Sequence, residues 1–298
     1  MIATNVPRAK RKPGRLALNI FALVFTIAPV YLLGQSIWRY VAATSSALSA
    51  ANDNKSIAAH KVSSQQVALF REPVVSITFD DGWGSVATTA APILSNYAIA
   101  TTEYIITDRV GQYNYMTLDQ LHALKAAGHE IASHSASHVP LGKASESSIE
   151  HELTSSKEFI VKNHLADSSS VDFAFPYGSY SPRSVELGVN NYATLRNSNG
   201  NPRDGIDNSD INIASNFKPE YIIGYGVEAD TKLSDIQAAL AYAKTNNGWL
   251  VLIFHQIDTS QSEYSVSPRM LEDILSAIQN ASIKTATMHD AYASRENK

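Results

Sequence analysis

The chain has 298 residues, of which 44% are hydrophobic and 17% are charged, and its formal net charge is −4. These proportions are ordinary for a folded protein, and the negative charge gives no reason to expect a nucleic-acid partner. Because the sequence contains no cysteine, disulfides, thiolate catalysis and cysteine-based zinc sites are excluded. Any metal must be held by histidine or carboxylate side chains.

The first 70 residues predict a membrane anchor and a linker. Residues 1–15 include the basic run PRAKRKPGR, and residues 16–38 carry no charge. About 23 helical residues reach roughly 34 Å, which is enough to cross a ~30 Å hydrocarbon core. The basic flank predicts a single-pass anchor with 1–15 in the cytoplasm and the rest outside. Secretion after signal cleavage is the alternative. The Ala- and Ser-rich segment 39–70 is typical of a stalk, and residues 71–298 of a folded domain.

From Arg71 onward, short apolar runs alternate with helical patterns. Ser147 and Ser234, each followed three residues later by Glu or Gln, predict capping boxes, and Thr117 and Ser267 are predicted as further N-caps. Strands are predicted at 74–79, 101–106, 129–133, 171–175, 249–254 and 283–288, and helices at 117–128, 147–163, 234–248 and 267–279. This alternation predicts a parallel sheet, and the absence of a dinucleotide fingerprint favours an α/β barrel over a doubly wound sheet.

Polar residues follow several of the predicted strands. Asp80 and Asp81 follow the first strand, His134 and His138 (HSASH) follow the third, and His255 follows the apolar run WLVLIF. The C-terminal strand ends are where a β/α barrel carries its chemistry, so these side chains are expected to meet. Two adjacent carboxylates in one cleft must share either a proton or a metal ion.

Two histidines four residues apart, joined by one carboxylate, form a three-ligand metal site with open positions. We therefore predict that Asp81, His134 and His138 hold a metal. This assignment leaves Asp80 as a general base beside the site. His255, from another strand, is predicted to stand opposite as a general acid.

The motifs TFDDG, HSASH, PYG and LIFH occur in this order, and together they resemble those of the polysaccharide deacetylases, carbohydrate esterase family four with its NodB homology domain. The resemblance covers about residues 74–290. It implies a distorted (β/α)7 barrel and metal-dependent removal of acetyl groups from polysaccharides. It also implies that the backbone N–H of Tyr177 donates to the oxyanion and that Ile253 lines the acetyl pocket. The resemblance also implies that Asp80 is the base and His255 the acid. It implies that Asp81, His134 and His138 are the metal ligands.

The sequence departs from the family pattern at two places. Ala174, in FAFPYG, stands where the third motif has an arginine that orients the base, and Arg183 and Arg196 are the candidate replacements. The aspartate of the fourth motif is not recognisable, and Glu228 or Asp230 could take its place. The FAFPYG form is similar to the branch that acts on exported poly-N-acetylglucosamine.

The resemblance predicts metal-dependent hydrolytic deacetylation of an N-acetylglucosamine-containing extracellular or cell-wall polysaccharide. Zinc is the expected metal for one aspartate and two histidines, and cobalt, nickel or manganese would also suit this site. The sequence indicates no protein partner. Two alternatives stay open: a catalytically weakened member that only binds glycan, and an O-acetyl esterase acting on an acetylxylan-like polymer.

Overall fold

The computed structural model describes residues 71–198 and 206–296. The predicted cytoplasmic tail (1–15), anchor (16–38) and stalk (39–70) lie outside the described residues. Within the described ranges, no helix is both long enough and apolar enough to cross a membrane.

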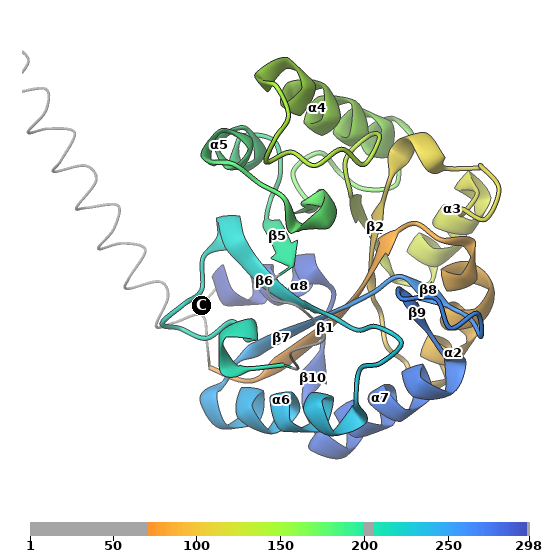
Figure 1. Ribbon diagram of the computed structural model, residues 1–298, viewed down its shortest axis with the longest axis vertical. Helices are drawn as coiled ribbons and strands as arrows, with labels where there is room; N and C mark the ends of the chain where they lie inside the picture. Colours follow the sequence, from red (N-terminus) through yellow and green to blue (C-terminus); the bar gives the residue numbers. More distant parts are fainter. Residues whose placement is uncertain (1–70, 199–205, 297–298) are drawn as a thin grey trace, which may run out of the picture. The chain divides into compact units, whose positions relative to one another are not determined.

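The described chain forms a closed barrel of seven parallel strands (Figure 1), which confirms the predicted α/β barrel. The strands are β1 (Val74–Asp81), β2 (Thr102–Ile105), β3 (Glu130–Ser133), β4 (Phe173–Ala174), β5 (Leu195–Ser198), β6 (Ile222–Gly226) and β7 (Trp249–Phe254). Pairing of β7 with β1 closes the ring. The short β10 (Lys284–Thr285) pairs with the start of β1, and β8 (Gln256–Ile257) pairs with β9 (Ser265–Val266).

Helices flank the outside of the barrel (Figure 1). In chain order they are a π-helical segment (Val86–Ala90), α2 (Ala91–Asn96), α3 (Leu118–Ala126), α4 (Glu146–Lys162), α5 (Pro182–Val189), α6 (Leu233–Asn246), α7 (Pro268–Ala281) and α8 (Met288–Glu296). Single 3-10 turns occur at Thr107–Arg109, Pro176–Gly178, Asn208–Asp210 and Pro219–Tyr221. Because strand side chains alternate, one set packs against the helices and the other fills the barrel.

Two of the predicted helix starts are confirmed and two are wrong. Thr117 caps α3 in a reciprocal capping box, and Ser267 caps α7. The N-cap of α4 is Ser145 rather than Ser147, because its extended backbone lets its side chain accept from the N–H of Ser148. Helix α6 starts after Lys232 without a side-chain cap. Ser234 is the second residue of this helix, so it lies inside the helix and does not cap it.

The strands β5 and β6 were missed by the sequence patterns. The first, LRNS, carries an arginine and an asparagine where an apolar run was required. The second, IIGYG, contains two glycines, which weaken the strand signal because glycine has no side chain to pack. Both strands contribute residues to the candidate site described next. Their polar and small residues belong to this site, which is why the strands lack an apolar pattern.

Candidate active site

The two adjacent aspartates reach the same pocket through an unusual backbone turn. Both belong to β1, where Asp80 is paired with Tyr104 and Asp81 with Ile105, so the strand runs two residues further than predicted. Regular alternation would send the two carboxylates to opposite faces. Asp81, however, has a φ of 73°, and Gly82 follows with a φ of 81°. The chain thus turns at Asp81 itself, and both carboxylates line one cavity.

The two histidines converge on Asp81 from the segment that follows β3. Their Nε2 atoms lie 3.2 Å apart. Oδ1 of Asp81 lies 3.3 Å from Nε2 of His138 and 3.6 Å from Nε2 of His134. His138 has a φ of 70°, and its N–H donates to the hydroxyl of Ser135, which fixes this turn. The three predicted metal ligands are therefore brought together, within 4.8 Å of one another.

The hydrogen bonds around these ligands fit a bound cation. Nδ1 of His134 lies 2.9 Å from the carbonyl oxygen of Ala174, which can only accept, so the ring carries its proton on Nδ1 and keeps a lone pair on Nε2. Trp83 donates to Oδ2 of Asp81, while Oδ1 is buried and has no hydrogen-bond partner among the described residues. Burial, together with the neighbouring His134, lowers the pKa of His138 to about 4, and burial also lowers that of His134. Both rings are thus neutral at pH 7, the form that binds metal.

Asp80 is held by Arg196, which supplies the guanidinium group that is absent at Ala174. Nη2 of Arg196 lies 2.6 Å from both oxygens of Asp80, and the arginine side chain is buried. Arg196 on β5 is the direct strand partner of Ala174 on β4. The arginine side chain therefore comes from the neighbouring strand at the same level of the barrel. The other candidate, Arg183, instead pairs with Glu146 at the surface.

The charge of Arg196 keeps Asp80 ionised despite its burial. Burial alone would raise the pKa of Asp80, but Arg196, and then His134 and His255, outweigh it and hold the pKa below its ordinary value. Asp80 is therefore a carboxylate at neutral pH, as a proton acceptor must be.

Removing the guanidinium should destabilise the fold. In Arg196→Met, Asp80 becomes a buried and unpaired charge, and breaking such a pair typically costs about 3–5 kcal/mol. We expect a loss of this order in urea unfolding at pH 7. The loss should shrink at acid pH, where Asp80 becomes protonated. In the matched double variant, Ala174→Arg with Arg196→Met, part of the stability should return because the two positions are adjacent. A variant as stable as the wild type at pH 7 would contradict the pairing.

His255 follows β7 and lines the same cavity as Asp80. Its ring packs against Tyr264 at 5.1 Å between centroids. Its buried Nδ1 has no hydrogen-bond partner in the described part of the chain, so neither Glu228 nor Asp230 supports that atom here. Glu228 lines the cavity, whereas Asp230 lines a neighbouring one of about 470 Å³.

Tyr177 lies at the mouth of the cavity in a strained turn. It has φ 58° and ψ 16°, and its exposed ring lies 4.4 Å from that of His138. Its N–H belongs to the first turn of a 3-10 element, where N–H groups have no partner within the helix. Gly178 follows, and a Cβ there would lie 3.0 Å from the carbonyl oxygen of Ser198, so the turn requires glycine.

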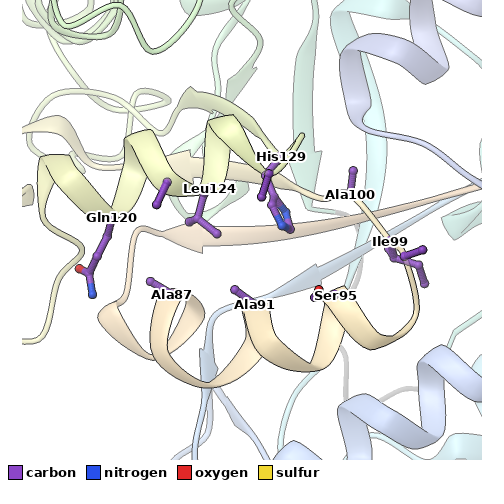
Figure 2. A pocket seen from close by; sticks show the side chains of 11 residues that line it. Ala87, Ala91, Ser95, Ile99, Ala100, Gln120, Leu124 and His129 are labelled. Atoms are coloured by element: carbon purple, nitrogen blue, oxygen red, sulfur yellow. The ribbon is translucent and has the colours of Figure 1, made fainter.

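The cavity of about 290 Å³ collects every residue predicted for the site. Its lining includes Asp80, Asp81, His134, His138, His255 and Tyr177, together with Arg196 and Ile253. A larger cavity of about 490 Å³ lies between the segment 86–96 and α3 and shares none of these residues (Figure 2). Size alone would have selected the wrong cavity.

The wall of this larger cavity covers a buried acid that makes the fold sensitive to pH. His129 lines the cavity (Figure 2) and lies 2.6 Å from the hydroxyl of Thr101, which donates to Glu103. Burial raises the pKa of Glu103 to about 8. Its contribution to stability is therefore complete below about pH 4.5 and is lost as the pH rises toward 8.

Glu103→Gln should remove this loss. At about 1.4 kcal/mol per pKa unit, the wild type should lose several kcal/mol more than the variant between pH 5 and pH 8. Urea unfolding of both proteins at the two pH values measures the difference. Parallel losses in the two proteins would show that Glu103 titrates normally.

Comparisons with known proteins agree with this geometry. Residues 69–193 match the family model described as polysaccharide deacetylase. The poly-beta-1,6-N-acetyl-D-glucosamine N-deacetylase of Staphylococcus aureus is 31% identical over 125 residues, which are 37% of this chain and 42% of that protein. The chain thus matches about two fifths of the length of its curated relatives. Arg196 and His255 lie beyond the family-model match, and the structure places both of them in the same cavity as the matched residues.

Two solved structures share the fold. The Xyl-CE4 domain of a multidomain xylanase from the hindgut metagenome of Trinervitermes trinervoides covers 76% of this chain and 92% of its own, with 19% identity and a TM-score of 0.52. A CE4 family pseudoenzyme from Bacillus anthracis covers 75% of this chain and 66% of its own, with 16% identity and a TM-score of 0.53. The barrel alone therefore does not imply activity. Residues 69–193 therefore match the polysaccharide deacetylase family, and the described chain shares its fold with these two solved structures.

Proposed function

We propose that the protein is a metal-dependent polysaccharide N-deacetylase that acts on an N-acetylglucosamine-containing extracellular or cell-wall polymer. The observation that carries this proposal is the convergence of a three-ligand site, an ionised aspartate and a histidine in one cavity. The family match over residues 69–193 and the S. aureus relative, which is named for poly-beta-1,6-N-acetyl-D-glucosamine, support a polymer of this kind.

Asp81, His134 and His138 would hold one divalent cation, most simply zinc. When bound, the cation would activate a water molecule and polarise the acetyl carbonyl. Asp80 accepts the proton of the attacking water, and its contact with Arg196 keeps its carboxylate ionised and oriented.

Tyr177 and His255 act on the carbonyl oxygen and on the leaving amine. The backbone N–H of Tyr177 donates to the carbonyl oxygen as negative charge develops there. His255 delivers a proton to the departing amine nitrogen. The C–N bond then breaks, giving acetate and a free amino group on the sugar.

A glycan-binding protein without activity is the weaker reading. Such a protein would need neither an ionised Asp80 nor an Asp81 whose buried Oδ1 has no hydrogen-bond partner in the described ranges, and the site has both. An O-acetyl esterase would use the same groups, but its leaving alcohol needs less help from an acid than an amine does. Dependence on His255 therefore separates the two enzymatic readings.

The test is acetate release from a panel of acetylated polymers. We expect release from β-1,6-linked N-acetylglucosamine oligomers, and weaker release from acetylxylan. Peptidoglycan and chitin oligomers complete the panel, and enzyme treated with a chelator is the control. Activity confined to acetylxylan would favour the esterase, and binding without release from any polymer would favour the glycan-binding protein.

We further propose that residues 16–38 anchor the protein in the membrane with the barrel outside. The charge asymmetry around this uncharged run supports the proposal. Protease added to intact spheroplasts should remove the barrel and leave a short stub in the membrane. A barrel protected until lysis would contradict the orientation, and a barrel free in the medium would instead indicate a cleaved signal peptide.

A further inference from the structure

Arg196 reaches Asp80 across the interior of the barrel, through a gap between small residues. On the two strands between β2 and β5, Ala132 and Ala174 pack in the same interior cluster as Tyr104. On the other side, a Cβ at Gly224 would lie 3.1 Å from Cδ of Arg196. A larger residue at these positions would compete with the arginine for space. The alanine found in place of the family's arginine thus leaves room for the substitute.

The contact between Arg196 and Asp80 does not by itself fix the guanidinium. A fork-like pair would use two parallel N–H···O bonds from two nitrogens. Here a single nitrogen, Nη2, contacts both carboxylate oxygens, and the buried Nε has no hydrogen-bond partner among the described residues. The guanidinium could therefore swing about this contact unless another group restrained its plane.

Tyr104 supplies that restraint. It is fully buried, and it is the strand partner of Asp80 on β2. The Cζ atom of Arg196 lies 4.8 Å from the centroid of the Tyr104 ring, within the range of a cation–π contact. The hydroxyl of Tyr104 has no hydrogen-bond partner in the described part of the chain. The ring face, rather than the hydroxyl, is therefore the part of Tyr104 that acts on the arginine.

We propose that Tyr104 is a positioning residue for the deacetylation reaction. Its ring holds the guanidinium of Arg196, which in turn orients Asp80 toward the attacking water. This inference rests on the proposed role of Asp80 as the base. Tyr104 lies in the barrel interior, on a different strand from the four motifs, and does not touch the substrate.

Three variants test the proposal on the full chain. Tyr104→Leu removes the ring, Tyr104→Phe keeps it, and Phe217→Leu is the control, since Phe217 is an equally buried aromatic of the same interior cluster that packs on Trp249. A 1 Å misplacement of a catalytic group can cost on the order of 100-fold. We expect kcat to fall by ~10- to 100-fold in Tyr104→Leu, with KM and metal content unchanged.

The other two variants separate positioning from packing. Tyr104→Phe should restore kcat to near the wild-type value, and Phe217→Leu should lose stability without losing kcat. Equal kcat in Tyr104→Leu and Phe217→Leu would overturn the proposal, as would a loss in Tyr104→Phe as deep as in Tyr104→Leu. If the leucine variant does not fold, Tyr104→Met takes its place, because methionine fills irregular space.

A second readout is independent of activity. In urea unfolding, Tyr104→Leu and Arg196→Met should destabilise less in combination than the sum of their separate effects, since each removes the same contact. Additive effects would overturn the contact. If the wild type releases no acetate from any glycan, the proposed function fails, and this cycle alone decides whether Tyr104 holds Arg196.

Discussion

His134→Ala should abolish both stoichiometric metal binding and acetate release while the barrel stays folded. The substitution removes one of the three proposed ligands and leaves only Asp81 and His138, which cannot enclose a cation. A bound metal typically supplies several kcal/mol of transition-state stabilisation, so the rate should fall on the order of 10³-fold or more. The fold should persist because, among the described residues, the side chain of His134 makes one hydrogen bond outside the proposed ligand group, to the carbonyl of Ala174.

Metal analysis of the purified variant, together with circular dichroism, measures both parts of this prediction. His122→Ala is the matched control, because His122 is an exposed histidine on α3. The control should keep full metal content and full activity. A folded His134→Ala protein with one tightly bound metal per chain would show that the ligands are assigned wrongly.

The location of the site was predictable because it depends on strand ends. In a parallel barrel the C-terminal ends of all strands meet at one face, so residues far apart in sequence converge once the strands are known. Asp80, His134 and His255 each directly follow or end an apolar run that can be recognised in the sequence. The histidine pair then needed only its own spacing to join the carboxylate.

The partners of the site were not predictable in the same way. Arg196 lies on a polar strand that shows no apolar pattern, and its contact with Asp80 depends on the register between β4 and β5. Register is a property of the whole sheet, so a single sequence offers two arginines and no means to choose between them. The turn at Asp81 was also hidden, because non-glycine residues rarely adopt a positive φ. The positive φ of Asp81 is a local backbone strain, and the contact between Arg196 and Asp80 is a long-range one. Both help to form the candidate site.

Asp80→Asn and Asp81→Asn should fail in different ways although the two residues are adjacent. Asn at position 80 leaves all three ligands in place and removes the proton acceptor, and loss of a general base typically costs ~10²–10⁴ in rate. Metal content should stay at one per chain, and added metal should not restore activity. The variant should also lose stability, because Arg196 then becomes a buried cation without its counter-ion.

Asn at position 81 acts on the metal itself. Trp83 donates to Oδ2 of Asp81, so the amide oxygen should remain with Trp83, which turns the NH₂ group toward the histidine Nε2 atoms. A donor then replaces an anionic ligand, metal affinity falls, and excess metal should restore part of the activity. Metal titration and kcat for both variants decide between the roles. Only a residue outside the coordination sphere can lose its charge and leave the cation in place, so an Asp80→Asn variant that loses its metal would make Asp80 a ligand. An Asp80→Asn variant that turns over normally with metal bound would show that Asp80 is not the proton acceptor. Either result would contradict the division of ligation and proton transfer between the two aspartates.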